Sequence, residues 1–257
     1  MNYIFQNFIS DLPMYLLSLP VILLSLSLHE CAHGFIALKF GDPTARNLGR
    51  LTLNPLKHLD PIGFICMLLF HFGWANPVPI NTRNLKNPRR DMALSALAGP
   101  LSNILLALVF GGLLRLALWA TTSFFGEDLT AIYTQLLMGN GFSASSGFVI
   151  LSLVVMMLYL GVIINFSYAI FNLIPVPPLD GSRIFYVFLP PKWYFGVMKY
   201  ERIIAIVMLA LLWLNILTIP LGWAVNGLTN VTFFIFGMNE ESSVALNLIQ
   251  FFVGSFI

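Results

Sequence analysis

The sequence predicts an all-α protein that crosses a membrane about four times, with short re-entrant or interfacial segments and a small β-hairpin or extended loop. Hydrophobic residues make up 58% of the 257 residues and charged residues only 9%, and the apolar residues gather in long runs. A soluble domain has about 25% charged residues, so most of this surface must face lipid. Because apolar runs occupy most of the length, we expect a single integral membrane domain over residues 1–257.

Four apolar runs are long enough for a transmembrane helix, which needs about 20 residues. They are Leu12–Leu38, Met92–Thr121, Phe148–Leu173 and Ile203–Val225. Two further runs, Ile62–Phe70 and Val244–Ile257, are shorter. We expect these two to be re-entrant or interfacial segments.

The basic residues orient the predicted spans. Residues 39–91, between the first and second runs, hold eight of the 13 basic residues, and four more lie between the third and fourth runs. The positive-inside rule places both segments in the cytoplasm. The predicted topology therefore has both termini outside, most simply in the cell membrane. The net charge of +2 gives no case for a nucleic-acid partner.

The segment 39–91 carries strand and turn patterns. Polar and apolar residues alternate over Arg50–Leu53 before an Asn-Pro pair, which is typical of a strand that ends in a turn. Residues 76–81 read Asn-Pro-Val-Pro-Ile-Asn, and two prolines so close together exclude a helix. We expect an extended segment or a hairpin there.

The cluster His29-Glu30-Cys31-Ala32-His33 matches the pattern H-E-x-x-H. Residues four apart lie on one face of a helix, so both imidazoles can bind one metal ion. Glu30 projects beside them and can act as a general base toward an attacking water. Ionisable residues within a membrane are usually functional, which favours a zinc site over a polar cluster that only holds helices together.

A catalytic zinc ion usually has three protein ligands and one open position, and the spacings of soluble enzymes do not supply the third. Metzincins would carry histidine where this chain has Lys39, and the next glutamate is Glu127, on the opposite side of the predicted membrane. The candidates on the correct side are Asp42, Asp60, Asp91, Asp180, Glu201, His58 and His71.

The surroundings of Asp180 distinguish it from the other candidates. It lies in the stretch 172–181, Asn-Leu-Ile-Pro-Val-Pro-Pro-Leu-Asp-Gly, at the end of the third run. Three prolines in four positions force irregular backbone at membrane depth, which is tolerated only beside protein or a water-filled cavity. The predicted topology places this loop and the two histidines at a similar depth near the cytoplasmic face.

Four stretches, taken in order, resemble the site-2 protease family of intramembrane zinc metalloproteases. They are residues 29–33, 73–81 (Gly-Trp-Ala-Asn-Pro-Val-Pro-Ile-Asn), 98–103 (Ala-Gly-Pro-Leu-Ser-Asn) and 172–181. The segments between the runs are too short for a PDZ domain, and the 31 residues after 226 are too few for a pair of CBS domains. The chain therefore resembles a minimal member of this family.

The resemblance implies a role for residues in each stretch. His29, His33 and Asp180 match the ligands of one zinc ion per chain, and Glu30 matches the general base. Asn172 matches an asparagine near the metal, whose amide could donate to the oxyanion that forms on the scissile carbonyl.

The two middle stretches match elements that surround the site. Residues 76–81 resemble a membrane-associated loop that pairs with an unwound substrate strand. The residues expected to bind substrate are Asn76, Pro77, Val78, Pro79 and Asn81. Near the start of the second run, small residues permit close helix packing. Gly99, Pro100 and Asn103 are the residues expected to pack the helices or support the site.

The implied activity is cleavage of the transmembrane segment of a membrane protein, in regulated intramembrane proteolysis or in clearance of membrane remnants. The expected partners are this substrate and the lipid bilayer, with selectivity set by the substrate or by an unidentified regulatory partner. The alternative is a membrane metal-binding or transport protein that does not hydrolyse peptides. Transport would favour polar residues lining several spans, and the third and fourth runs have few besides Asn165, Ser167 and Asn215. An inactive scaffold is a third reading, against which the intact Glu30 argues.

Overall fold

The computed structural model describes residues 2–70, 73–125, 146–190, 196–197, 199–214 and 216–238. Most of these residues are helical, which confirms the predicted helical membrane fold. Three helices in the described part are long and apolar enough to cross a membrane. Their candidate spans are Tyr15–Lys39, Pro88–Phe124 and Val149–Leu173.

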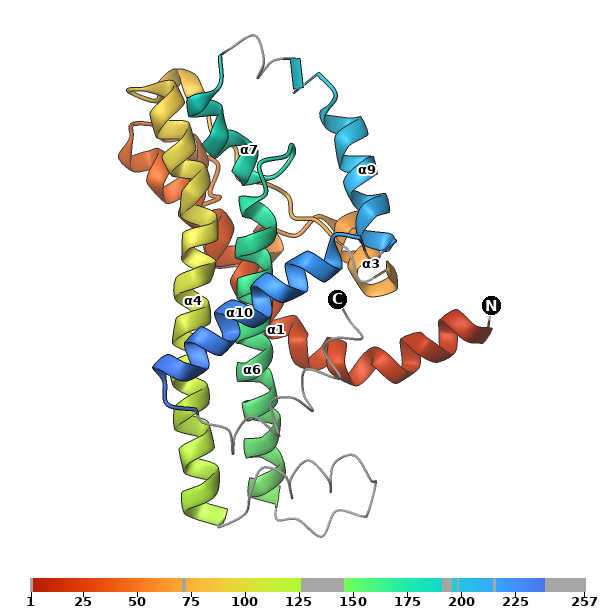
Figure 1. Cartoon of the computed structure of the whole chain (residues 1–257). Coiled ribbons are helices and arrows are strands. Elements are labelled where there is room, and N and C mark those ends of the chain that lie inside the picture. Colours follow the sequence, from red (N-terminus) through yellow and green to blue (C-terminus); the bar gives the residue numbers. More distant parts are fainter. Residues whose placement is uncertain are drawn as a thin grey trace.

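Three long helices form the frame of the molecule: α1 (Asn2–Lys39), α4 (Pro88–Phe125) and α6 (Ser146–Leu173). Helices α4 and α6 run side by side, and α1 packs against both (Figure 1). Large apolar side chains of α4 and α6 fill the contact between them, including the fully buried Leu114 and Tyr159. A side chain at Gly161 would overlap the ring of Phe110, so this glycine lets α4 and α6 approach closely.

The predicted fourth span, Ile203–Val225, is not confirmed as one helix. Helix α9 (Glu201–Trp213) ends near its middle, and helix α10 (Thr218–Ile235) begins a few residues later. Pro220 gives the physical reason, because proline interrupts a helix interior but is tolerated in a first turn, where it lies in α10. Helix α10 packs across α6 and α4 (Figure 1).

The connection between α1 and α4 contains only short elements. These are α2 (Thr44–Asn47), η1 (Pro55–Lys57), α3 (Pro61–Phe70) and η2 (Thr82–Asn84). The ten residues of α3 span about 15 Å, half of a hydrocarbon core of about 30 Å. This helix is therefore too short to cross, in agreement with the prediction for Ile62–Phe70. The predicted segment Val244–Ile257 lies outside the described residues.

The predicted hairpin in this connection is not confirmed. The only β-pairing among the described residues is an isolated antiparallel bridge between Leu59 and Ala75. Residues 51–53 form bends and not a strand, and the guanidinium of Arg50 donates to the backbone oxygen of Asn76. The segment 76–81 is non-helical, as its prolines predict.

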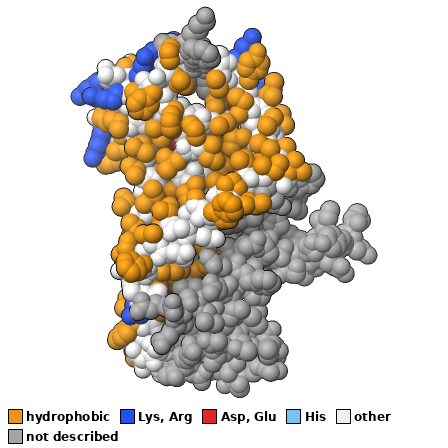
Figure 2. Space-filling model, in the orientation of Figure 1, with side chains coloured by type: hydrophobic (Ala, Val, Ile, Leu, Met, Phe, Trp, Pro, Cys, Tyr) orange, Lys and Arg blue, Asp and Glu red, His pale blue; other side chains and the backbone are white. Residues whose placement is uncertain are grey.

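The surface matches a membrane environment. Figure 2 shows hydrophobic side chains over much of the visible flank, with most of the Lys and Arg side chains on this face at the end of the molecule where α7 (Asp180–Phe185) lies. Large apolar side chains such as Leu105, Trp223 and Phe234 are more than 60% exposed. Water would not stabilise such a surface, but lipid does.

Candidate metal centre

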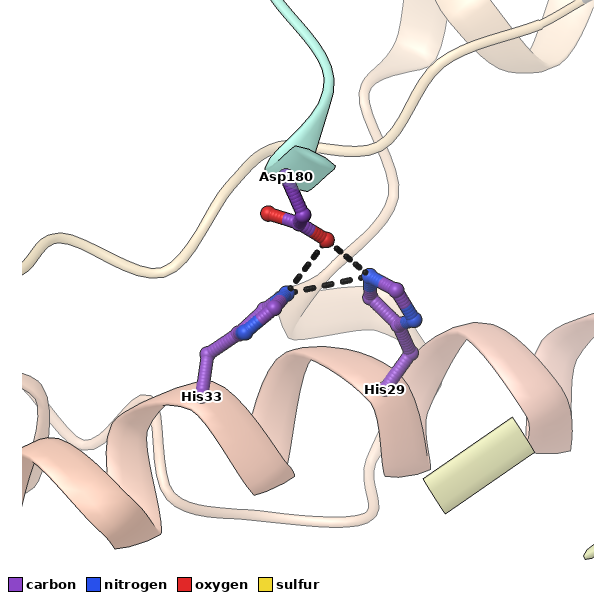
Figure 3. A group of neighbouring side chains, drawn as sticks. All are labelled: His29, His33 and Asp180. Atoms are coloured by element: carbon purple, nitrogen blue, oxygen red, sulfur yellow. Dashed lines mark hydrogen bonds and ion pairs between the residues drawn. The ribbon is translucent and has the colours of Figure 1, made fainter. Parts of the chain in front are cut away.

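Two histidines and an aspartate meet in the interior, near the end of the molecule that carries the basic residues. His29 and His33 project from α1, one turn apart, and Asp180 reaches them from the start of α7 (Figure 3). The Nε2 atoms of the histidines are 3.0 Å apart, and each lies 3.1 Å from Asp180 Oδ2. All three residues are less than 9% exposed. They are the only group of potential metal ligands of this kind in the described part of the chain.

Gly181 allows Asp180 to reach the histidines. A Cβ atom at Gly181 would lie 2.3 Å from the carbonyl oxygen of Ile174 and 2.4 Å from that of Leu173. The start of α7 therefore packs directly against the backbone at the end of α6. The proline-rich residues 174–179 form an irregular loop between the two helices, and this close contact holds Asp180 beside the histidines.

Gly99 allows helix α4 to approach the same histidines from the other side. A Cβ atom at this position would lie 2.4 Å from Cε1 of His33 and 2.6 Å from Cε1 of His29. The α4 backbone thus lies directly against both imidazole rings. The predicted packing role of Gly99 agrees with this position, and the neighbouring Pro100 is buried within the same helix.

Helix α4 also supplies a hydrogen-bond partner for each ring. His33 Nδ1 donates to the backbone oxygen of Ser95 at 2.7 Å, and His29 Nδ1 donates to Oδ1 of Asn103 at 2.6 Å. In a neutral imidazole with its hydrogen on Nδ1, Nε2 carries a lone pair. Both lone pairs point toward the carboxylate of Asp180, so three acceptors converge on one place.

This convergence fits a bound cation. Without a cation between them, the two imidazole lone pairs and the carboxylate oxygen of Asp180 would repel one another. Zinc binds histidine nitrogen and carboxylate oxygen at about 2.0–2.2 Å with tetrahedral geometry, which places its ligand atoms about 3.3 Å apart. The observed separations of 3.0–3.1 Å are close to this value, and the donor set suits zinc.

Glu30 lies beside the triangle and is held by the segment 76–81. Its Oε2 accepts a hydrogen bond of 2.8 Å from the backbone N–H of Val78, and its side chain is buried. Gly34 brings the segment close to α1, because a Cβ atom there would lie 3.1 Å from Val78 Cγ1 and 2.7 Å from Leu51 Cδ2. The structure thus places the predicted base next to the predicted substrate-binding loop.

Residues of the connection fix both ends of this loop. At its start, Asn76 N–H donates to the carbonyl oxygen of His58, and Arg50 donates to the carbonyl oxygen of Asn76. At its end, the buried carboxylate of Asp42 accepts from the Asn81 backbone N–H at 2.7 Å and from the Asn84 side chain at 2.8 Å. The sequence did not indicate these anchoring roles of Arg50 and Asp42.

The other predicted site residues lie in different surroundings. Asn172 is in the last turn of α6, where its side-chain amide donates to the carbonyl oxygen of Tyr168 at 3.0 Å. Asp60 accepts from the Gly63 N–H at the start of α3, and Asp91 pairs with Arg90. These carboxylates therefore have structural partners away from the histidines.

Two remaining alternatives for the third ligand are also accounted for. His58 is buried and donates from Nε2 to the carbonyl oxygen of Thr52, and Glu201 begins helix α9. His71 lies outside the described residues. Asp180 is the one sequence candidate that the described part of the chain brings to both histidines.

Comparison of the amino-acid sequence with known proteins identifies one family. The family model described as Peptidase family M50 matches residues 18–215. The "Putative zinc metalloprotease YwhC" of Bacillus subtilis (strain 168) is 40% identical over 170 residues, which are 66% of this chain and 68% of that protein. No solved structure matches the chain.

More distant relatives carry a similar name. The "Putative zinc metalloprotease Rip2" of Mycolicibacterium smegmatis (strain ATCC 700084 / mc(2)155) is 30% identical over 165 residues, 62% of this chain and 52% of that protein. Its namesake in Mycobacterium tuberculosis (strain ATCC 25618 / H37Rv) is 33% identical over 129 residues, 45% of this chain and 49% of that protein. The chain thus aligns with about half the length of these two proteins.

Proposed function

The chain belongs to peptidase family M50, and from this membership we propose that it cleaves peptide bonds within the transmembrane segments of other membrane proteins. It is a zinc metalloprotease. The observation that carries the proposal is the buried triangle of His29, His33 and Asp180, which lies among apolar helices with Glu30 beside it. A peptidase site in such surroundings suits a substrate that is itself embedded in lipid.

Three residues are proposed to hold the zinc ion: His29, His33 and Asp180. When bound, zinc supplies a Lewis acid, which polarises a peptide carbonyl and makes water acidic enough to lose a proton near neutral pH. Ser95 and Asn103 keep the imidazole hydrogens on Nδ1, so that Nε2 of each ring is free to bind. Three protein ligands leave one position for water or substrate, as in other catalytic zinc sites.

Glu30 is proposed as the general base. Its Oε2 is anchored by the Val78 N–H, which leaves Oε1 to accept a proton from the water that attacks the scissile carbonyl. The same carboxyl then returns the proton to the nitrogen of the leaving amine. Asn172 lies at the end of α6 near Asp180, and rotation of its amide away from Tyr168 would let it donate to the oxyanion.

The loop 76–81 is proposed to bind the unwound substrate. Prolines at 77 and 79 have no N–H, so the remaining donors belong to alternate residues, which lie on one side of an extended segment. One of them, the Val78 N–H, points to Glu30. Because the N–H groups of Asn76 and Val78 already bond to His58 and Glu30, an unwound substrate is proposed to pair with the other backbone groups of the loop, next to the base. Added strand pairing is a common way to bind extended peptides.

The distribution of basic residues supports an orientation in the membrane. Lys and Arg gather at the end of the molecule that carries Asp180 and the loop (Figure 2), and this end is proposed to face the cytoplasm. The cell membrane is the proposed location. Substrates would be intact transmembrane helices or remnants left by an earlier cleavage. The family match does not favour the alternative of a metal transporter without hydrolysis.

Cleavage of a labelled transmembrane segment by the purified protein in detergent tests this function. We expect cleavage to stop when a chelator removes zinc and to return when zinc is restored. Mass spectrometry of the products should place the cut within the apolar part of the substrate. A cut confined to polar flanking residues, or cleavage that persists in chelator, would contradict the proposal.

A further inference from the structure

Behind the metal ligands, a line of side-chain amides crosses three helices. Starting from His29 on α1, the line runs to Asn103 on α4 and then to Asn165 on α6. Asn103 Nδ2 donates to Asn165 Oδ1 at 2.9 Å, and Asn165 Nδ2 donates to the carbonyl oxygen of Gly161 at 2.8 Å. Both asparagines are fully buried.

The line has a fixed direction. A backbone carbonyl can only accept a hydrogen bond, so Gly161 requires the NH₂ group of Asn165 to face it. The oxygen of Asn165 must then face Asn103, which turns the NH₂ group of Asn103 toward Asn165. The oxygen of Asn103 is thereby left to accept from Nδ1 of His29. Since Nδ1 carries the hydrogen, the lone pair of His29 lies on Nε2, the atom that faces Asp180.

Reversal of the Asn103 amide would have the opposite effect. Its NH₂ group would then face Nδ1 of His29, which would have to become the acceptor, with the hydrogen moved to Nε2. A protonated Nε2 cannot bind a metal ion. Besides Asn165, the carbonyl oxygen of Ser25 opposes this reversal, through a longer contact of 3.4 Å with Asn103 Nδ2.

We propose that Asn165 is a positioning residue that acts through Asn103 to keep His29 ready to bind the metal. The inference rests on the proposed zinc site, but it concerns a residue that does not touch the metal ligands. Some other buried polar side chains of these helices are not connected to the metal ligands by hydrogen bonds. The hydroxyl of Thr121 on α4, for example, bonds only to the carbonyl oxygen of Ala117 on its own helix, so it connects no helices.

The test compares three variants of the full-length, zinc-loaded chain. Asn165→Leu removes the acceptor for Asn103. Asn165→Asp, whose fully buried carboxyl group stays protonated, keeps a donor toward Gly161 and an oxygen toward Asn103, and it should behave like the unmodified protein. Thr121→Val removes a buried hydrogen bond that does not lead to the site, and it serves as the matched control.

Two measurements test the hydrogen bonds from Asn165 to His29 without an assay of proteolysis. Zinc affinity, measured by competition with a chelator, should fall at least about tenfold in Asn165→Leu, as for other residues that orient metal ligands. The second readout is the Nδ1–H resonance of His29 after ¹⁵N-histidine labelling, which is tractable because the chain has four histidines. This proton should exchange faster and move upfield in Asn165→Leu alone.

Several outcomes would overturn the proposal. One is an Asn165→Leu protein with unchanged zinc affinity and an unchanged His29 resonance. Another is an equal loss in Asn165→Asp, since that variant keeps the acceptor. If Asn165→Leu does not fold, Asn165→Ala replaces it with the same expectations, because it removes the same groups without adding bulk. Failure of proteolysis alone would refute the proposed function and leave these two readouts unaffected.

Discussion

Replacement of Gly99 by alanine tests the architecture of the metal centre most sharply. The added Cβ would lie 2.4–2.6 Å from ring atoms of His33 and His29, whereas carbon atoms in contact lie about 3.5–4.0 Å apart. Each ring, or helix α4 itself, must therefore move by roughly 1 Å. The rings cannot simply rotate away, because Ser95 and Asn103 on the same helix hold them.

A shift of this size exceeds what a zinc site tolerates. Ligand distances must lie within about 0.2 Å of their ideal values, and a misplacement of 1 Å can reduce catalysis about 100-fold. We expect Gly99→Ala to weaken zinc binding by about 100-fold, which corresponds to about 2.8 kcal/mol. Loss of helix stability would not explain such a result, because alanine is the better helix former by about 0.8–1.0 kcal/mol.

The assay is zinc affinity by chelator competition, with Gly112→Ala as the matched control. This position lies on the same helix, and its Cβ would meet only the ring of Phe236 at 3.3 Å, which a small movement of that ring relieves. The control should bind zinc like the unmodified protein. Wild-type zinc affinity in Gly99→Ala would refute the inference that α4 packs directly against the two ligands.

Two further changes test separate parts of the site. Asp180→Ala should lose zinc as well as activity, because two ligands remain of three, and full metal occupancy by atomic absorption would show that another residue is the third ligand. Asp42→Asn should raise KM for a helical substrate by about tenfold with zinc content unchanged, because Asp42 anchors the loop that is proposed to bind substrate and one hydrogen bond to a charged group contributes about 1.5–3 kcal/mol. A lower kcat with unchanged KM would contradict this role. Burial alone would raise the pKa of Asp42, but hydrogen bonds from Thr44, Asn84 and Asn81 lower it overall. The contribution of Asp42 to loop stability should therefore be complete above about pH 4 and decline only as the pH falls below that value, and loop hydrogen exchange that already accelerates near pH 6 would argue against it.

The part of the site that could be predicted from the sequence rests on short-range patterns. The four-residue spacing of His29 and His33 fixes their common helix face, whatever the rest of the fold. The prolines before Asp180 marked an irregular segment, and the resemblance to the site-2 protease family singled out that carboxylate among several. The metalloprotease activity and zinc are confirmed by the family match, and the role of each residue stays a prediction.

The supporting residues could not be predicted, because their contacts join distant parts of the chain. Ser95 meets His33 across 62 residues, and Asn81 meets Asp42 across 39. A carboxylate that accepts backbone hydrogen bonds has no sequence pattern that separates it from an exposed one. Asn165 was visible as a polar residue in an apolar run, but its connection to His29 depends on how three helices pack.

The less accurate part of the fold prediction concerns boundaries. Hydropathy counts apolar residues and so joined Ile203–Val225 into one span, although Pro220 lies within it and the helix divides. Alternation over Arg50–Leu53 suggested a strand, but residues 51–53 form bends. In the first case the missing N–H and fixed backbone of proline override the average hydrophobic pattern.

The most direct test of the central claim measures zinc content and substrate cleavage together in Glu30→Gln. This substitution keeps the size of the side chain, leaves all three proposed ligands in place and removes the base. The account predicts one zinc ion per chain, as in the unmodified protein, with no detectable cleavage of a transmembrane segment. Cleavage at the normal rate by zinc-loaded Glu30→Gln would contradict it.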